Sequence, residues 1–202
     1  QRLMDIIMSG LQLSICLSYL DDIVVFSATE DQHLERLEAI LQRLRSAGLK
    51  LKPEKCCLFR RSVSFLGHVI SENGIGTDPK KTQAVAEWPT PECVRDVRAF
   101  LGLASYYRRF VQGFARIAAP LTAITKKNQR FCWSEDAQTA FDALKVAMTS
   151  VPILAMPTDD DYYVLDTDAS DWSIGAVLSQ RQKGEEKVIA YASRVMDKRE
   201  RN

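Results

Sequence analysis

Two adjacent aspartates between two apolar runs are the feature that most restricts how this chain can fold. Residues 16–27 read CLSYLDDIVVFS, with Asp21 and Asp22 at the centre. Short apolar runs rich in β-branched residues predict strands at residues 13–17 and 23–26, joined by a turn at residues 19–22. An ordinary hairpin tip is one interpretation, because aspartate is common in turns. A cation site is the other, because like charges placed together are costly unless they are paired or hold a metal ion.

Composition indicates a soluble globular protein with room for one large domain or two small ones. The chain has 202 residues, of which 46% are hydrophobic and 26% are charged. No apolar run reaches the length of a membrane span, so we expect no membrane partner. The five cysteines are odd in number and lack CxxC spacing, which favours reduced core or strand residues of an intracellular protein over a zinc site.

The formal net charge of +1 hides two segments of opposite charge. Between Arg95 and Arg130 there are eight basic side chains and one acid, Asp96, while residues 159–171 hold six aspartates and no base. A basic segment suits a polyanionic partner and an acidic one suits metal ions. Two solvated faces would give the same pattern, so the charges alone leave both interpretations open.

The first 77 residues predict an α+β arrangement. A helix already under way at Gln1 ends at Gly10, and an amphipathic helix runs from Thr29 or Asp31 to Ala47. Residues 49–59 and 63–74 predict two more strands, closed by the turn at Asn73 and Gly74.

Helical periodicity follows, and strand alternation then returns. Helices are predicted at residues 79–88, 117–125 and 134–148, and a long one from Pro91 to Val111, capped by Thr90. The segment SYYRRF leaves two interpretations open: core positions for Tyr106 and Phe110, or clamping of a nucleic-acid backbone by Arg108 and Arg109. From Pro152 onward three strands are predicted, with QRQKGEEK as the loop between the second and third, and a helix from about Met196.

Several segments together resemble one family. YLDDIVVFS, KPEKCCLF, FLGHVIS, the run from WPTPECVRD to YYRRF, and LDTDASDWSIGAVLSQ occur in the order seen in the reverse transcriptase–ribonuclease H polyprotein of gypsy-type long-terminal-repeat retrotransposons. The resemblance implies an α+β fold in which residues 1–77 are the end of the polymerase palm, residues 78–150 the thumb and connecting helices, and residues 151–202 the beginning of a ribonuclease H-like βββα unit.

The resemblance implies a two-metal polymerase site at the first hairpin. Asp21 and Asp22 would be catalytic metal ligands for Mg²⁺ or Mn²⁺, with Asp21 as the favoured direct ligand, and Tyr19 would lie against the primer end. Hard divalent cations take oxygen ligands held by a rigid turn, which a strand–turn–strand with adjacent acids provides.

The resemblance also implies a primer grip that holds the primer terminus near the metals, formed by Phe65, Leu66, Gly67 and His68. We interpret His68 as a surface strand histidine without an acid–base role. Lys55 resembles a lysine near the incoming triphosphate, although its surroundings suit a solvated turn equally well.

A second carboxylate pair would serve ribonuclease H chemistry. Asp168, in TDAS, and Glu200 match metal-binding catalytic positions of that fold by resemblance. Asp166 shares a strand face with Asp168 and stays a candidate; Asp171 lies near, and the acids at residues 159–161 are interpreted as a solvated loop.

The parent protein is therefore expected to be an RNA-directed DNA polymerase with ribonuclease H activity. Its partners would be an RNA template, a DNA primer, RNA/DNA hybrid and dNTPs, with upstream palm and fingers and downstream ribonuclease H segments of the same polyprotein. Further catalytic acids would precede Gln1 and follow Asn202, so the isolated chain is expected to be inactive or nearly so. The alternative is a non-catalytic nucleic-acid-binding remnant of a degenerate or host-captured element. We expect an intracellular location, in a cytoplasmic virus-like particle or the nucleus.

Overall fold

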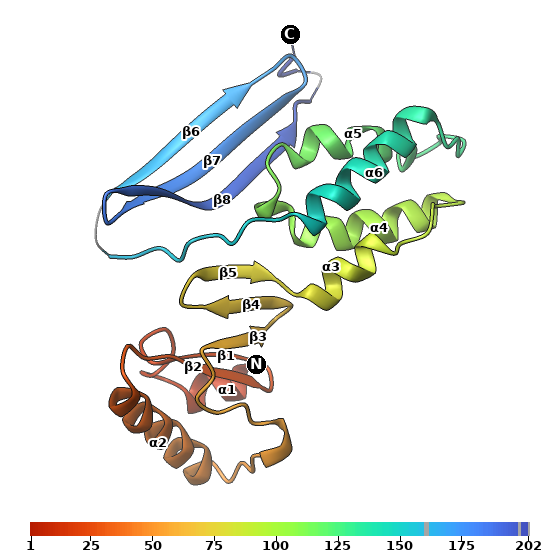
Figure 1. Cartoon of the computed structure of the whole chain (residues 1–202). Helices are drawn as coiled ribbons and strands as arrows, with labels where there is room; N and C mark the ends of the chain where they lie inside the picture. The colour runs from red at the N-terminus through yellow and green to blue at the C-terminus, as the bar shows by residue number, and fades with distance from the viewer. Residues whose placement is uncertain (160–161, 198, 202) are drawn as a thin grey trace. The chain divides into compact units, whose positions relative to one another are not determined.

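The computed structural model describes residues 1–159, 162–197 and 199–201, which group into two compact units (Figure 1). The first unit is Gln1–Phe65 and the second is Leu66–Asn202. Each has its own cluster of buried apolar side chains. We placed boundaries at residues 77 and 150 by resemblance to the subdomains of the family. In the structure, residues 78–150 and the strands that follow share one hydrophobic core. In the described part of the chain, no helix has the length and apolar character that crossing a membrane demands.

The first unit places a hairpin beside a long helix. Its elements are α1 (Arg2–Ile7), β1 (Cys16–Tyr19), β2 (Asp22–Val25), α2 (Glu30–Ser46), the 3-10 turn η1 (Pro53–Lys55) and β3 (Ser62–Phe65). Thr29 caps α2, since its side chain accepts a hydrogen bond from the Gln32 amide at 3.3 Å. The unit's core consists of Ile7, Met8, Cys16, Ile40 and Leu44.

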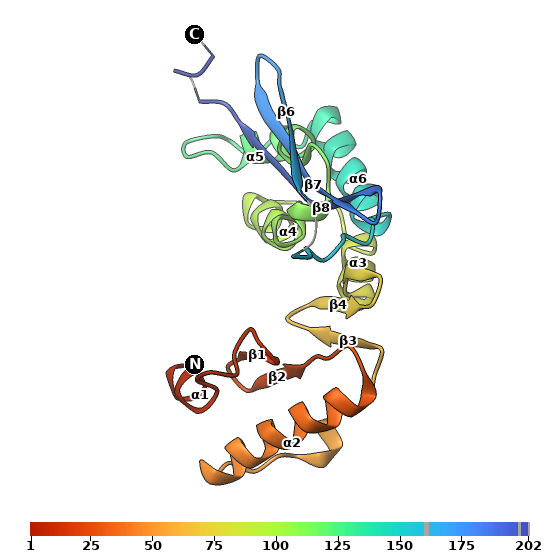
Figure 2. The same ribbon diagram turned by 90° about the vertical axis from the view of Figure 1, so that its left-hand side faces the viewer.

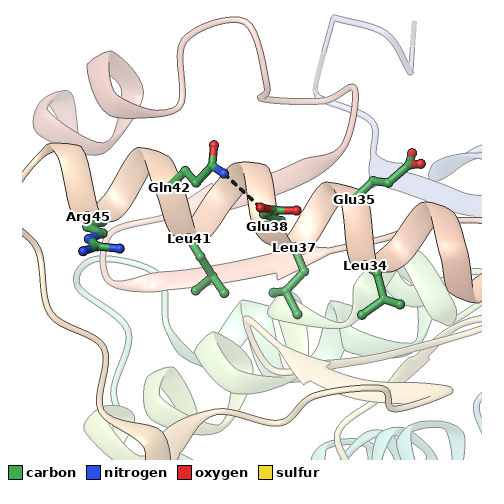
Figure 3. Close-up of a pocket in the computed structure, with 7 residues that line it drawn as sticks. All are labelled: Leu34, Glu35, Leu37, Glu38, Leu41, Gln42 and Arg45. Carbon is green, nitrogen blue, oxygen red and sulfur yellow. Dashed lines mark hydrogen bonds between the residues drawn. The ribbon is translucent and has the colours of Figure 1, made fainter.

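The predicted amphipathic stripe of α2 is only partly covered. Ile40 and Leu44 are buried, with 2% and 4% of their surface exposed, whereas Leu34 and Leu41 are 54% and 40% exposed. Figure 3 shows Leu34, Leu37 and Leu41 in a row along one side of the helix, where they line a shallow pocket. Half of the stripe therefore forms the unit's core, and half lies at the surface of the described chain.

Two predictions were wrong, one for a strand of the first unit and one for the cysteines of both units. Residues 49–59 form no strand, because Pro53 instead begins the 3-10 turn η1, where the proline ring suits the fixed backbone angle. The cysteines were expected in the core or in strands, but only Cys16 is; Cys56, Cys57, Cys93 and Cys132 are exposed free thiols.

The second unit packs helices against a hairpin and a three-stranded sheet (Figures 1 and 2). Its first elements are β4 (His68–Ser71), β5 (Gly74–Thr77), α3 (Pro79–Ala86), α4 (Val94–Tyr106) and the 3-10 turn η2 (Arg108–Phe110). They are followed by α5 (Phe114–Ile124), α6 (Glu135–Thr149), β6 (Tyr163–Ala169), β7 (Ser173–Gln182) and β8 (Glu185–Val195). The last three strands are antiparallel in the order β6-β7-β8, and α5 packs on β8.

Several boundaries in the second unit differ from the predicted ones. The helix α4 runs from Val94 to Tyr106, so its predicted start at Pro91 and its predicted cap, Thr90, were wrong. The Asp96 carboxylate accepts from the Glu92 amide at 3.2 Å, just before the helix. The strands β7 and β8 extend into the predicted loop, since Lys183 and Gly184 make the reversal with φ of 53° and 84°. The helix expected from Met196 is not formed among the described residues, where residues 199–201 are a turn.

Candidate functional site

The acid pair lies at the tip of the first hairpin. Tyr19 pairs with Asp22 in the ladder, which leaves Leu20 and Asp21 as the two turn residues. Leu20 has φ of 51°, a left-handed conformation that costs a residue other than glycine about 1–2 kcal/mol. Tyr19 and Leu20 are each 50% exposed, and both aspartates are exposed. The turn therefore presents two carboxylates to solvent from a strained, two-residue reversal.

Two glutamine side chains hold this turn, and no sequence pattern predicted them. The Gln12 carboxamide accepts hydrogen bonds from the Ser18 amide at 3.1 Å and hydroxyl at 3.0 Å. The Gln1 carboxamide oxygen accepts from the Leu20 amide at 2.6 Å. Ser18 is only 5% exposed, so its polar groups need these partners. The two glutamines contact Ser18 and Leu20 at separations of 6 and 19 residues, which follow no periodic pattern.

The residues of this tip fit a hard divalent cation. Among the residues that the structure describes, the side chains of Asp21 and Asp22 make no hydrogen bond and no ion pair. Exposed carboxylate oxygens on a rigid turn are suitable ligands for Mg²⁺ or Mn²⁺. However, no group of three or more His, Cys, Asp or Glu side chains in the described part of the chain is placed to hold a metal.

The predicted primer-grip segment contains a second strained turn. Leu66 and Gly67 have φ of 48° and 71°, and we call this reversal the 66–67 turn. The Tyr107 hydroxyl donates to the Gly67 carbonyl at 2.6 Å, and the Tyr106 hydroxyl donates to the Leu66 carbonyl. Burial raises the pKa of Tyr107 to about 12, so its hydroxyl stays protonated as a donor.

His68 is not the surface histidine that we predicted. Its ring stacks on Tyr106 with centroids 5.3 Å apart and meets Tyr107 and Phe110 at 5.6 Å. Its Nδ1 atom is buried without a hydrogen-bond partner among the described residues. Desolvation lowers the pKa of His68, and the charge of Arg109 lowers it further, so the neutral ring is favoured. Phe65 is half-buried at the end of β3.

Of the two core residues predicted in the segment SYYRRF, Phe110 is confirmed and Tyr106 is not. Tyr106 is 50% exposed, so its assignment to the core was wrong; Tyr107 and Phe110 are the buried pair, at 1% each. The helix ends at Tyr106 and continues as the 3-10 turn η2, which rotates the side chains away from the α-helical spacing.

The guanidinium groups of Arg108 and Arg109 contact the neighbouring strand β8. Arg108 donates to the Ser193 carbonyl, and Arg109 donates to the Ile189 carbonyl at 3.4 Å. Both side chains are largely exposed. The structure thus gives them contacts within the fold, and binding of a nucleic-acid backbone by their exposed groups stays a prediction. Lys55 is exposed at the end of η1.

The candidate ribonuclease H carboxylates lie on β6, the exposed edge strand of the third sheet, β6-β7-β8. Asp166 and Asp168 are exposed in β6, where alternation places them on one face, and Asp168 lies opposite Gly175 of β7. Asp171 is exposed in the bend that follows β6. Of the acids at residues 159–161, Asp160 and Asp161 lie outside the described residues.

Glu200 is engaged with its own chain. It forms a bidentate pair with Arg194, with both N–O distances 2.6 Å, and accepts from the Asp197 amide at 2.9 Å. Asp197 in turn accepts from the Glu200 amide at 3.0 Å, so the two residues are joined by reciprocal hydrogen bonds. The Arg194 hydrogen bonds lower the pKa of Glu200 to about 2. Its oxygens are therefore less available to a cation than those of Asp168.

Two family profiles match the chain, one over each part where candidate carboxylates lie. Residues 1–70 match "Reverse transcriptase (RNA-dependent DNA polymerase)", and residues 133–202 match "RNase H-like domain found in reverse transcriptase". Both matches fall in the order expected from the sequence. The two matched segments carry a reverse transcriptase part and an RNase H-like part, as in gypsy-type Pol polyproteins.

Curated relatives from Drosophila melanogaster support this assignment over the whole chain. The "Retrovirus-related Pol polyprotein from transposon opus" is 40% identical over 213 aligned residues, which cover 100% of this chain and 21% of the relative. The Pol polyprotein from transposon gypsy is 37% identical, with 100% and 20% covered. The chain thus spans about a fifth of the length of these relatives.

Solved structures agree on the fold. The foamy viral protease-reverse transcriptase dRH in complex with double-stranded DNA superposes with a TM-score of 0.86 at 25% identity, over 98% of this chain and 34% of that one. The same viral enzyme in complex with RNA/DNA hybrid gives a TM-score of 0.84 at 25% identity, over 98% and 27%. The expected mixed α and β fold of the reverse transcriptase and RNase H-like type is confirmed.

Proposed function

We propose that this chain serves an RNA-directed DNA polymerase with ribonuclease H activity, in which Asp21 and Asp22 hold the divalent cations. The observation that carries the proposal is the exposed acid pair on a hairpin tip that Gln1 and Gln12 hold in place. A bound Mg²⁺ or Mn²⁺ would make an attacking 3′-hydroxyl easier to deprotonate and would stabilise the negative charge of the leaving pyrophosphate. The chain itself supplies two rigid carboxylates and, from Tyr19, a half-exposed ring suited to packing against a primer nucleotide.

The partners follow from the same proposal. RNA template, DNA primer, RNA/DNA hybrid and dNTPs would be bound together with further polymerase and ribonuclease H segments of the polyprotein. The foamy viral structures, solved with double-stranded DNA and with hybrid, support this choice of ligands. The exposed groups of Arg108 and Arg109, and the 66–67 turn with Phe65 and His68, are proposed to contact the primer–template.

The ribonuclease H step is assigned to the exposed edge of the third sheet. Asp168 is proposed as a metal ligand for RNA-strand hydrolysis, with Asp166 on the same face as a second candidate. Glu200 would join them only if its pair with Arg194 opened, because both of its oxygens are engaged. The free thiols support an intracellular location, in a cytoplasmic particle or the nucleus.

Primer extension tests the polymerase proposal. The protein is the chain expressed with the flanking coding sequence of its gene, assayed on a primed RNA template with Mg²⁺. Asp21→Asn should abolish extension, because it removes one charged ligand, whereas Asp31→Asn, on the exposed first turn of α2, should leave it intact.

Extension that survives Asp21→Asn would refute the assignment of the acid pair. Salt-sensitive binding of hybrid duplex without extension and without metal dependence would establish the alternative, a non-catalytic nucleic-acid-binding remnant.

A further inference from the structure

The 66–67 turn is unusual because its conformation is held from outside the turn. Two successive residues have positive φ, and one of them, Leu66, is not a glycine. A turn of this kind persists only where the surroundings impose it. The carbonyl groups of Leu66 and Gly67 both accept hydrogen bonds from tyrosine hydroxyls that lie 40 residues further along the chain.

The two tyrosines enclose the turn on its glycine side. A Cβ atom built on Gly67 would lie 3.3 Å from the Tyr107 hydroxyl oxygen and 3.4 Å from Cε1 of Tyr106. The Gly67 carbonyl accepts a second hydrogen bond, from the Asp78 amide at 3.2 Å. The turn is therefore in close contact with both rings, and only a residue without a side chain fits there without displacing them.

The tyrosines are themselves fixed by the core of the second unit. They end α4, whose residues Val97, Phe100 and Ala104 are fully buried. Tyr107 is 1% exposed and makes an edge contact with Tyr106, and the His68 ring packs on both. The helical core therefore fixes the position of the 66–67 turn through these two tyrosines.

We infer that Tyr106 and Tyr107 are positioning residues of the proposed polymerase: their hydroxyl groups fix the 66–67 turn, and through it the bound primer strand, to the C-terminal end of α4. This inference rests on the proposed function, in which the turn contacts the primer. Neither tyrosine is required to touch the reacting atoms. Their part is to hold two backbone carbonyls so that the turn has one conformation when the primer binds.

Tyrosine-to-phenylalanine variants test the inference, because they keep the rings and remove only the donors. In the polymerase polypeptide with its flanking sequence, Tyr107→Phe should lower the single-turnover rate of nucleotide addition about fivefold, the factor that one neutral hydrogen bond represents. The Kd for primer–template should stay within twofold. Tyr163→Phe is the matched control, since Tyr163 is 53% exposed on β6 and should not change the rate.

A second measurement on the same variants is independent of catalysis. Amide hydrogen exchange at Asp78, whose amide donates to the Gly67 carbonyl, should be faster in Tyr107→Phe than in the wild type and unchanged in Tyr163→Phe. If the wild-type polypeptide adds no nucleotide but the exchange result holds, the proposed function fails and the restraint on the turn stands.

Two results would overturn the inference. One is a Tyr107→Phe protein with unchanged exchange at Asp78, which would show that the hydroxyl does not restrain the turn. The other is faster exchange, or a lower melting temperature, with an unchanged rate of nucleotide addition per active molecule, which would show a role in the fold alone.

Discussion

Single residues in this chain are fixed by neighbours that lie far away in the sequence, and Gly74 is the clearest case. It has φ of 126°, and a Cβ atom placed on it would lie 2.1 Å from the carbonyl oxygen of Leu154. The Ile75 amide donates to that same carbonyl at 2.8 Å, so the two backbones are in direct contact. The sequence indicated a turn at Asn73 and Gly74, whereas the turn residues are Glu72 and Asn73 and Gly74 begins β5. Only the packed structure explains why no side chain fits at Gly74.

Replacing this glycine should destabilise the second unit. We expect Gly74→Ala to lower the free energy of unfolding by more than about 2 kcal/mol, because it adds both strain and a clash with backbone. Urea denaturation followed by circular dichroism measures the change. The matched control is Gly102→Ala, which meets open space within α4 and should stabilise the helix by up to about 1 kcal/mol. Equal effects of the two variants would contradict this account.

The acidic residue Glu200 offers a test of pH dependence. Its pKa is lowered from 4.5 to about 2, chiefly by the hydrogen bonds from Arg194. A lowered pKa in the folded state means that the paired form contributes stability above pH 4.5, and that this contribution is lost as the pH falls from 4.5 through about 2. Carbon-detected NMR titration of the carboxyl group should give a midpoint near 2.

The variant Arg194→Gln supplies the control for that titration. Without the guanidinium, the pKa of Glu200 should return toward 4.5. A midpoint near 4.5 in the wild type would show that the pair is not held in solution, and the oxygens of Glu200 would then be free for a cation.

Among the elements, α2 shows how one helix can follow its pattern and still leave part of it uncovered. Its leucines and isoleucine recur at helical spacing, yet only Ile40 and Leu44 are buried. Figure 3 shows the exposed leucines on the side that carries the shallow pocket. Periodicity identifies the apolar face of a helix, but it does not say which turns of that face are covered.

The two classes of leucine should respond differently to truncation. We expect Leu44→Ala to cost about 2–5 kcal/mol of unfolding free energy, because it leaves a cavity in the first unit's core. Leu34→Ala, on the same helix, should change stability by no more than about 0.5 kcal/mol, as is usual for an exposed site. Chemical denaturation of both variants measures the difference. A large loss in Leu34→Ala would show that its side chain is covered in solution.

At the scale of the whole molecule, the described residues form two separate clusters of buried side chains. The cluster of the first unit is small and centres on Ile40 and Leu44, while that of the second extends from α3 to β8 around Phe100 and Phe141. A boundary between compact units falls between Phe65 and Leu66, inside the segment that resembles a primer grip. Units with their own cores are expected to unfold as separate cooperative transitions.

Denaturation should therefore resolve two transitions. Leu44→Ala should shift only the transition of the first unit, and Phe141→Ala, at a side chain 1% exposed, only that of the second. Amide hydrogen exchange at increasing denaturant assigns each transition to its residues. A single transition that both variants shift equally would show that the two cores unfold together.

The sequence by itself determined the family, the class of fold and the place of the acid pair. The sequence contains three local patterns: YLDD between apolar runs, FLGH, and TDAS in a strand. Local patterns of this kind depend on neighbouring residues alone. The hairpin around Asp21 and the strand with Asp168 were predictable for that reason. The prediction of a strand at residues 49–59 was wrong, because a local apolar pattern does not show whether a partner strand is present.

Only the tertiary structure decided which groups support those sites. Three contacts show this: Gln12 accepts from Ser18, Tyr107 donates to the Gly67 carbonyl, and Arg194 pairs with Glu200. In each, the two residues are separated in the sequence by a distance that no helix or strand period predicts. Tyr107 is buried in place of Tyr106, because α4 ends between them and a 3-10 turn begins. Such contacts depend on where helices end and how cores close, and these follow from packing of the whole unit.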